Sequence, residues 1–273
     1  MRPAVVSKPN VSNQAVLRVG GVSYLNSKPL LYGLEDDASL KLQLEVPSRL
    51  LGDLQAAKLD VALLPVIDYQ KMPGLTVLPV GGIASDGPTL TVRIFSSRPI
   101  EEIETLACDS DSHTSIALAR IVLAESFGIQ PQLVELTGET PREVGRLLIG
   151  DKVVCQRHEG LDHQLDLGAA WKTLTGMPFV FAIWTARQGV QLGDLPARLS
   201  KALDEGLAHL PEIVARHAVP RGWPRELAME YLSVNLQFRI GPAHLRAIAH
   251  FHELAARYGI IPKPPRALQL HAE

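Results

Sequence analysis

Cysteine is nearly absent from this sequence, since only Cys108 and Cys155 occur among its 273 residues. A small fold held together by disulfides needs a denser set of cysteines, so that class is excluded. The two residues lie far apart along the chain, and we expect both to be reduced, buried thiols. The stability of the fold must therefore come from apolar packing, for which 46% of the residues are suited.

Long apolar runs and an excess of one charge are missing as well. No run approaches the ~18 apolar residues that a membrane-spanning helix needs, and 27 Lys and Arg nearly balance 29 Asp and Glu. Without a basic stripe, we expect neither nucleic acid nor a membrane as a partner. Residues 1–15 lack the apolar core of a secretory signal, so we expect a frayed leader on a cytoplasmic protein, either monomer or homodimer.

Motifs for nucleotides, metals and serine nucleophiles are absent too. The sequence has no G-x-x-x-x-G-K-[ST], no G-x-G-x-x-G and no G-x-S-x-G. His158 and His163 are five apart, which is not the spacing of H-E-x-x-H, and His250 and His252 are expected on a solvated helix face. We therefore expect no metal and no cofactor.

The first part of the chain alternates predicted strands and helices. Apolar runs typical of buried strands are separated by stretches in which leucine and alanine recur at helical spacing. This β-α-β-α-β order is the signature of a parallel sheet with right-handed crossovers. The expected strands are residues 17–25, 40–47 and 61–67, and the expected helices are 27–35 and 48–60, capped by Ser27 and Ser48.

A second α/β unit follows after an interruption. Residues 76–97 form two extended runs around a Gly/Pro-rich turn with no helix between them, and apolar residues 178–187 could cross back. Helices from Leu195 onward are expected to pack on the first unit. Within the second unit we expect strands at 105–109, 131–136 and 152–156, and helices at 110–128, 140–150 and 166–176.

These elements predict a two-lobed α/β fold with a ligand cleft between the lobes and two crossing hinge strands. The first lobe combines residues 16–94 with 188–273, and the second lobe comprises residues 95–187. In such folds, ligands bind between the lobes, against strand ends and helix N-termini.

Neutral polar residues cluster where predicted helices begin. Asn26-Ser27, Ser48 and SDSHTS at 110–115 supply amides, hydroxyls and backbone N–H groups at such positions. Several polar helix starts facing one cleft would suit a small anion, because helix N-termini favour negative charge. Simple N-capping is the alternative for each of them. Composition and pattern alone therefore indicate a two-lobed protein that binds a small anion.

At these same residues the chain resembles the chorismate dehydratase family of the futalosine route to menaquinone. The similar segments are RVGGVSYLNSKPLLYGL, LDVALLPV, GGIASDGPTLTVRIFSS, SHTSIALARIVLAESFG, LLIGD and DLGAAWKTLTGMPFVFAIWTAR. The resemblance implies a type II periplasmic-binding-protein-like fold. It also implies a cofactor-free lyase that removes water from dianionic chorismate to give 3-[(1-carboxyvinyl)oxy]benzoate.

The resemblance also implies site residues. Asn26 and Thr91 are the implied catalytic residues, although many relatives carry Ser in place of Thr91. His113 stands where some relatives have Arg. The implied substrate-binding residues are Tyr24, Ser27, Pro65, Gly87, Thr114, Ser115 and Asp151.

The general base and one rival function stay open at this point. Asp151, Asp86 or the enolpyruvyl carboxylate of the substrate itself could take the proton. A non-catalytic solute-binding protein of the same fold is the main alternative, because fold does not determine function. A sister enzyme, dihydroxynaphthoate synthase, has a different N-terminal motif from GGVSYLN.

Overall fold

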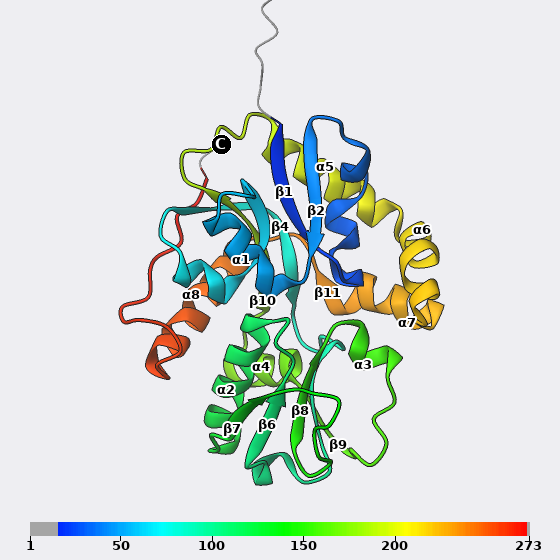
Figure 1. Ribbon diagram of the computed structural model, residues 1–273, viewed down its shortest axis with the longest axis vertical. Helices are drawn as coiled ribbons and strands as arrows, with labels where there is room; N and C mark the ends of the chain where they lie inside the picture. Colours follow the sequence, from blue (N-terminus) through cyan, green and yellow to red (C-terminus); the bar gives the residue numbers. More distant parts are fainter. Residues whose placement is uncertain (1–15, 272–273) are drawn as a thin grey trace, which may run out of the picture.

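Two β-sheets, one above the other in Figure 1, organise the chain in the computed structural model, which describes residues 16–271. The six-stranded sheet has the order β11-β4-β10-β3-β1-β2, and the five-stranded sheet has the order β7-β6-β8-β5-β9. The expected leader at residues 1–15 lies outside the described residues. The limits of the two lobes at residues 94 and 187 stay a prediction.

The first sheet is parallel at one side and antiparallel at the other. β1 pairs in parallel with β2 and β3, as its β-α-β pattern predicts, whereas β10 runs antiparallel to β3 and β4. All five residues of β3 are buried, which explains its continuous apolar run. The strands are β1 (Leu17–Val22), β2 (Leu40–Glu45), β3 (Val61–Pro65), β4 (Leu75–Ser85), β10 (Phe179–Arg187) and β11 (Leu236–Gln237).

The second sheet corrects two sequence predictions. Residues 140–150 were expected to be helical, but Gly145–Ile149 form β8, which pairs with β5 and β6. Residues 152–156 were expected to be a strand, but Asp151–Cys155 form the short helix α3, after Gly150 turns the chain at φ +61°. Its strands are β5 (Val92–Ser96), β6 (Thr105–Cys108), β7 (Gln132–Glu135), β8 (Gly145–Ile149) and β9 (His163–Asp166).

Helices cover both sheets. The α-helices are α1 (Pro47–Gln55), α2 (His113–Phe127), α3 (Asp151–Cys155), α4 (Leu167–Thr175), α5 (Leu195–Ala208), α6 (Leu210–Ile213), α7 (Arg225–Glu230) and α8 (Pro242–Arg257). The 3-10 helices are η1 (Leu25–Leu31), η2 (Leu34–Asp36), η3 (Val66–Lys71), η4 (Ile100–Glu102) and η6 (Val219–Arg221). Two π-helical turns are η5 (Val214–Ala218) and η7 (Tyr231–Asn235).

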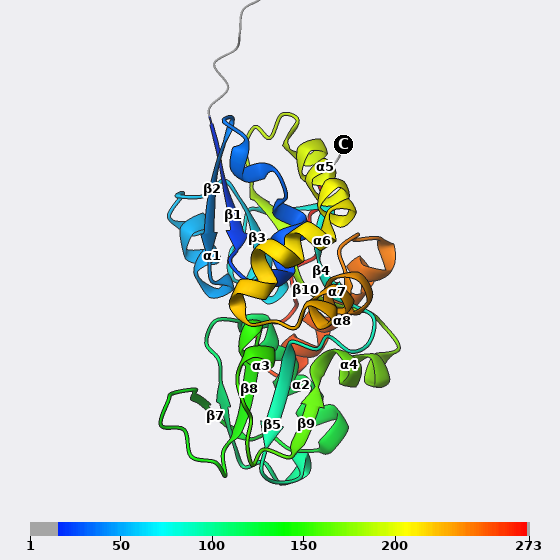
Figure 2. The same cartoon turned by 90° about the vertical axis from the view of Figure 1, so that its right-hand side faces the viewer.

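The last helix, α8, joins the two layers, and in Figure 2 it lies at the level where the sheets meet. The Phe251 ring of α8 packs edge-on against Phe179 of β10 and Trp171 of α4, with ring centroids 5.0 and 6.0 Å apart. Arg257 pairs with Glu125 of α2 at 3.2 Å. The expectation that the C-terminal helices pack only on the first lobe is therefore incomplete.

Both cysteines are free thiols, as predicted. Cys108, at the end of β6, is buried, and burial raises the pKa of its thiol to about 12. Cys155, at the end of α3, is exposed, so the prediction that both are buried is wrong for Cys155. The expectation came from the general tendency of free cysteines to be buried, which Cys155 does not follow at the end of the short helix α3.

A close backbone contact seats η1 against α5. A Cβ atom at Gly206 would overlap with the carbonyl oxygen of Pro29. Ser27 is fully buried in the same 3-10 helix, and its hydroxyl donates to the carbonyl of Val22. Glycine at 206 therefore lets η1 lie where it does.

We expect Gly206→Ala to lower the melting temperature, because overpacking of this kind costs ~1–3 kcal/mol. The matched control is Gly52→Ala in α1, where a Cβ atom meets nothing within 4 Å. That change should stabilise the fold by up to ~1 kcal/mol, since alanine favours a helix interior. Thermal unfolding of both variants checks this. Equal stability of the two variants would contradict the role given to Gly206.

Candidate functional site

A cavity lies where the strand ends of the first sheet face the second sheet. The empty space in it is about 510 Å³, a figure that includes open solvent at its mouth. Elements from both sheets contribute to it, as a cleft between two lobes requires. The lining residues are Val22, Tyr24, Asn26, Pro47, Pro65, Ile83, Thr89, Thr91, Val92, Ser112, Ser115, Ile149, Gly150, Phe181, Ala182, Tyr231 and Leu236.

The amide of Asn26 is the unusual polar group of this cavity. Its Oδ1 atom is buried and finds no hydrogen-bond partner among residues 16–271. The N-cap of η1 is Tyr24, and no side-chain cap bond forms there in the described chain, so N-capping does not explain Asn26. Leaving a buried acceptor unpaired costs ~1–3 kcal/mol. The orphaned oxygen therefore points to a hydrogen bond that a ligand completes.

Ser27 and Ser48 are not the helix caps that the sequence suggested. Ser27 lies inside η1, and α1 begins at Pro47 with Val46 as its N-cap. The backbone N–H of Ser48 instead donates to the carbonyl of Asp111 at 3.1 Å, across the two sheets. Both serines thus serve the local fold or the contact between lobes rather than a cap.

Thr91 and Tyr231 form a buried hydroxyl pair, with 2.7 Å between their oxygen atoms. Burial raises the pKa of Tyr231, and the side chains of Thr91 and Asn26 oppose that rise from beside its hydroxyl. Tyr231 is therefore protonated near neutral pH and can donate a hydrogen bond. It occupies a π-helical turn, a local irregularity often found at functional sites.

Tyr231 is the functional candidate that the sequence did not reveal. It lies 140 residues from its partner Thr91, within a stretch whose pattern indicated only a helix. A register change to i→i+5 hydrogen bonds is invisible in residue spacing. The aromatic residue in YLSVN was the one available signal.

The start of α2 supplies a second polar wall. Ser112 is the N-cap, and its Oγ accepts from the backbone N–H of Ser115 at 3.3 Å and lies 2.9 Å from the Ser115 hydroxyl. Both serines line the cavity, whereas Thr114 turns away and accepts from the backbone N–H of Ile67 at 3.4 Å. A helix of 15 residues beginning here favours an anion in the cavity.

Some of the predicted site residues lie outside the cavity lining. Asp151 accepts from Trp223 Nε1 and from Arg221, both at 3.1 Å. Asp86 pairs with Lys172 at 2.6 Å in an exposed position. Gly87, at φ +134°, adjoins Gly168 of α4 through its carbonyl. Among the described residues, neither candidate base, Asp151 nor Asp86, lines the cavity.

Ion pairs and hydrogen bonds close the rim of the cavity. Tyr24 donates its hydroxyl to Asp111 at 2.7 Å, joining η1 to the start of α2. Lys152 binds both Asp109 and Asp111, at 2.7 and 2.9 Å. Burial raises the pKa of Asp111, but the hydrogen bonds from Tyr24 and Lys152 outweigh burial, so the pKa is lowered. The charges at the rim are thus paired with one another, and the Tyr24 hydroxyl connects them to the first lobe.

Histidines do not build a metal centre in the part of the chain that the structure describes, where no cluster of three or more potential ligands occurs. His113 contacts Asp68 at 2.8 Å instead of facing the cavity. His252 is buried, so the expected solvated face is wrong for it. It donates to the Val66 carbonyl, and burial lowers its pKa to about 4.

A family comparison identifies the class of protein. The chain matches the family model described as menaquinone biosynthesis over residues 17–257. The chain belongs to the menaquinone biosynthesis family. The resemblance inferred from the sequence is thereby confirmed. Within residues 16–271, no helix has the length and apolar character that a bilayer crossing requires.

Two similar proteins of known name are both called chorismate dehydratase. The one from Thermus thermophilus is 27% identical over 258 residues, which cover 85% of this chain and 88% of that protein. The one from Campylobacter jejuni is 28% identical over 167 residues, covering 60% of this chain and 61% of that protein.

Solved structures confirm the predicted type II periplasmic-binding-protein-like fold. A protein of Archaeoglobus fulgidus aligns with a TM-score of 0.72 at 15% identity, covering 90% of this chain and 98% of that one. The alkanesulfonate-binding protein SsuA from Xanthomonas axonopodis pv. citri, bound to MOPS, aligns with a TM-score of 0.68 at 15% identity. That alignment covers 92% of this chain and 96% of the other.

If Asn26 serves a ligand, removing its amide should not weaken the free protein. We expect Asn26→Leu to keep or raise the melting temperature, because an unpaired buried oxygen is replaced by an apolar group. Ser112→Ala is the control, and loss of this N-cap should cost ~1 kcal/mol. Thermal unfolding without ligand measures both. A loss at Asn26 as large as that at Ser112 would mean that the amide is structural.

Proposed function

We propose that this chain is a chorismate dehydratase, a lyase that removes water from chorismate to give 3-[(1-carboxyvinyl)oxy]benzoate for menaquinone biosynthesis. The observation that carries the proposal is the buried, unpartnered Oδ1 of Asn26 in a cavity between the two sheets. The names of the Thermus and Campylobacter relatives support it.

The reaction removes the hydrogen at C3 and the hydroxyl at C4 of chorismate. The ring becomes aromatic, so the reaction is strongly downhill, and the enzyme has to accelerate it while suppressing competing reactions of the side chain. Loss of the C3 proton moves charge through the ring diene toward the C1 carboxylate. Donors aimed at that carboxylate stabilise the transition state more than the ground state.

Ser112 and Ser115 are the residues we place at the ring carboxylate. Their hydroxyls line the cavity at the N-terminus of α2, where the helix dipole favours negative charge. Hydroxyls and backbone N–H groups bind a carboxylate without placing a full positive charge beside it. They can therefore follow the growth of charge during proton removal.

Thr91 and Tyr231 are placed at the departing C4 hydroxyl. Their 2.7 Å pair presents a protonated phenol next to Asn26. A hydrogen bond donated to the leaving oxygen lowers the barrier to C–O cleavage, and the departing hydroxide takes up a proton to leave as water. Asn26 both donates and accepts hydrogen bonds without adding charge to a site for a dianion.

The enolpyruvyl carboxylate of the substrate is the base that this cavity favours. Among residues 16–271, no aspartate, glutamate, histidine, lysine or arginine lines it. A carboxylate carried by the substrate and held near C3–H by Asn26 needs no such residue. Enclosure between the lobes would supply proximity and exclude water.

Incubation of the purified chain with chorismate tests the proposal directly. We expect the aromatic product, seen by its ultraviolet spectrum and mass, and undiminished turnover after exhaustive chelation. Activity lost on chelation and restored by one metal would contradict the metal-free chemistry. Binding of chorismate without any turnover would favour the non-catalytic solute-binding alternative.

The substitution Asn26→Asp separates a site residue from a structural one. Loss of one hydrogen bond to a charged group costs ~1.5–3 kcal/mol, or roughly tenfold to over a hundredfold in affinity or rate. The new carboxylate also repels a dianion, so we expect Asn26→Asp to bind substrate more weakly than Asn26→Ala. Steady-state kinetics and calorimetry on both variants measure this. Near-native turnover and affinity in Asn26→Asp would rule out the proposed role.

A further inference from the structure

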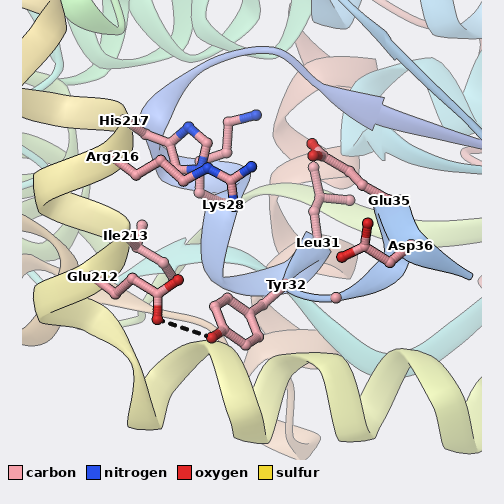
Figure 3. Close-up of a pocket in the computed structure, with 10 residues that line it drawn as sticks. Lys28, Leu31, Tyr32, Glu35, Asp36, Glu212, Ile213, Arg216 and His217 are labelled. Atoms are coloured by element: carbon pink, nitrogen blue, oxygen red, sulfur yellow. Dashed lines mark hydrogen bonds between the residues drawn. The ribbon is translucent and has the colours of Figure 1, made fainter.

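A second hollow opens on another side of η1 and shares no lining residue with the cavity of Asn26. It lies between η1–η2 and α6–η5 and encloses about 670 Å³, its solvent-open part included. Figure 3 shows Lys28, Arg216 and His217 grouped together, with Glu35 and Asp36 on the opposite side. The mechanism proposed above uses none of these residues.

Lys28 is a largely buried residue that lines this hollow. The residue is only 7% exposed, yet its ammonium group has no hydrogen bond or ion pair within residues 16–271. Burial lowers the pKa of Lys28, the charges of Arg221 and Arg216 lower it further, and Glu35 opposes them. The Lys28 ammonium nitrogen is not one of the fully buried atoms that lack a partner, so it borders the open hollow, where an anion can reach it.

Two further donors lie beside Lys28. Arg216 is exposed and makes no ion pair in the described part of the chain. Burial lowers the pKa of His217, and the nearby charges of Lys28 and Arg216 lower it further. A neutral imidazole still donates one N–H. Three side chains thus bring donors and positive charge to one side of a hollow whose lining also includes the carboxylates of Glu35, Asp36 and Glu212. Glu212 accepts from the Tyr32 hydroxyl at 3.1 Å.

We propose that this hollow binds a small phosphate-type anion through Lys28, Arg216 and His217. Three donors on separate side chains suit a tetrahedral oxyanion, which offers several oxygen atoms, and arginine and lysine are both strong phosphate donors. Glu35 and Asp36 are exposed on the other rim, where they could accept from hydroxyl groups. Both inorganic phosphate and the phosphate group of a hydroxylated compound fit this chemistry.

Calorimetry on the full chain tests the site with inorganic phosphate and with glycerol phosphate, against acetate at equal ionic strength. Arg216→Gln is the main variant, because its exposed side chain leaves the fold intact, and Lys28→Met is the second. Arg225→Gln is the matched control, an exposed arginine of α7 outside the hollow. Tighter binding of glycerol phosphate than of inorganic phosphate would identify the ligand as a phosphorylated compound rather than free phosphate.

We expect phosphate to bind wild type more tightly than acetate does. Arg216→Gln and Lys28→Met should weaken phosphate binding about tenfold or more, while Arg225→Gln leaves it unchanged. Asn26→Asp should also leave it unchanged, which separates this site from the cavity of Asn26. Equal binding of phosphate and acetate, full affinity in Arg216→Gln, or loss of binding in Asn26→Asp would each overturn the proposal.

Discussion

The close seating of η1 between β1 and α5 is the constraint on which both polar regions of this protein depend. Gly206 allows the α5 backbone to reach Pro29, and the buried hydroxyl of Ser27 ties the 3-10 helix back to Val22. With these contacts made, Asn26 lines the cavity between the sheets and Lys28 lines the second hollow. A shift of this one short helix would displace both side chains together.

Charge is distributed unevenly around that helix. The cavity is lined by apolar and neutral polar residues, while the ionised groups at its rim are engaged with one another, as in Lys152 with Asp109 and Asp111. Neutral donors and a helix N-terminus can hold a dianion without burying an unpaired cation when the cavity is empty. Lys28 departs from this arrangement, because it is a largely buried residue that makes no ion pair within residues 16–271.

Much of the fold could be predicted from apolar periodicity, but not all of it. The β-α-β start and α2 and α4 follow their patterns, because their buried faces recur at the period of the element. The prediction for residues 140–156 was wrong because GRLLI is an apolar run that suits a helix or a strand. Pairing with β5 and β6 decides for the strand, and no local signal contains that pairing.

The sequence by itself determined the α/β class, the absence of metal and nucleotide motifs, the family resemblance and the choice of Asn26 as the central polar residue. Only the tertiary structure decided which neighbours share its cavity. Tyr231 lies beside Thr91, Thr114 faces Ile67, and Asp151 is held by Arg221 and Trp223. The reason is physical: these partners are far apart along the chain, and their hydrogen bonds exist only once the two sheets have packed together.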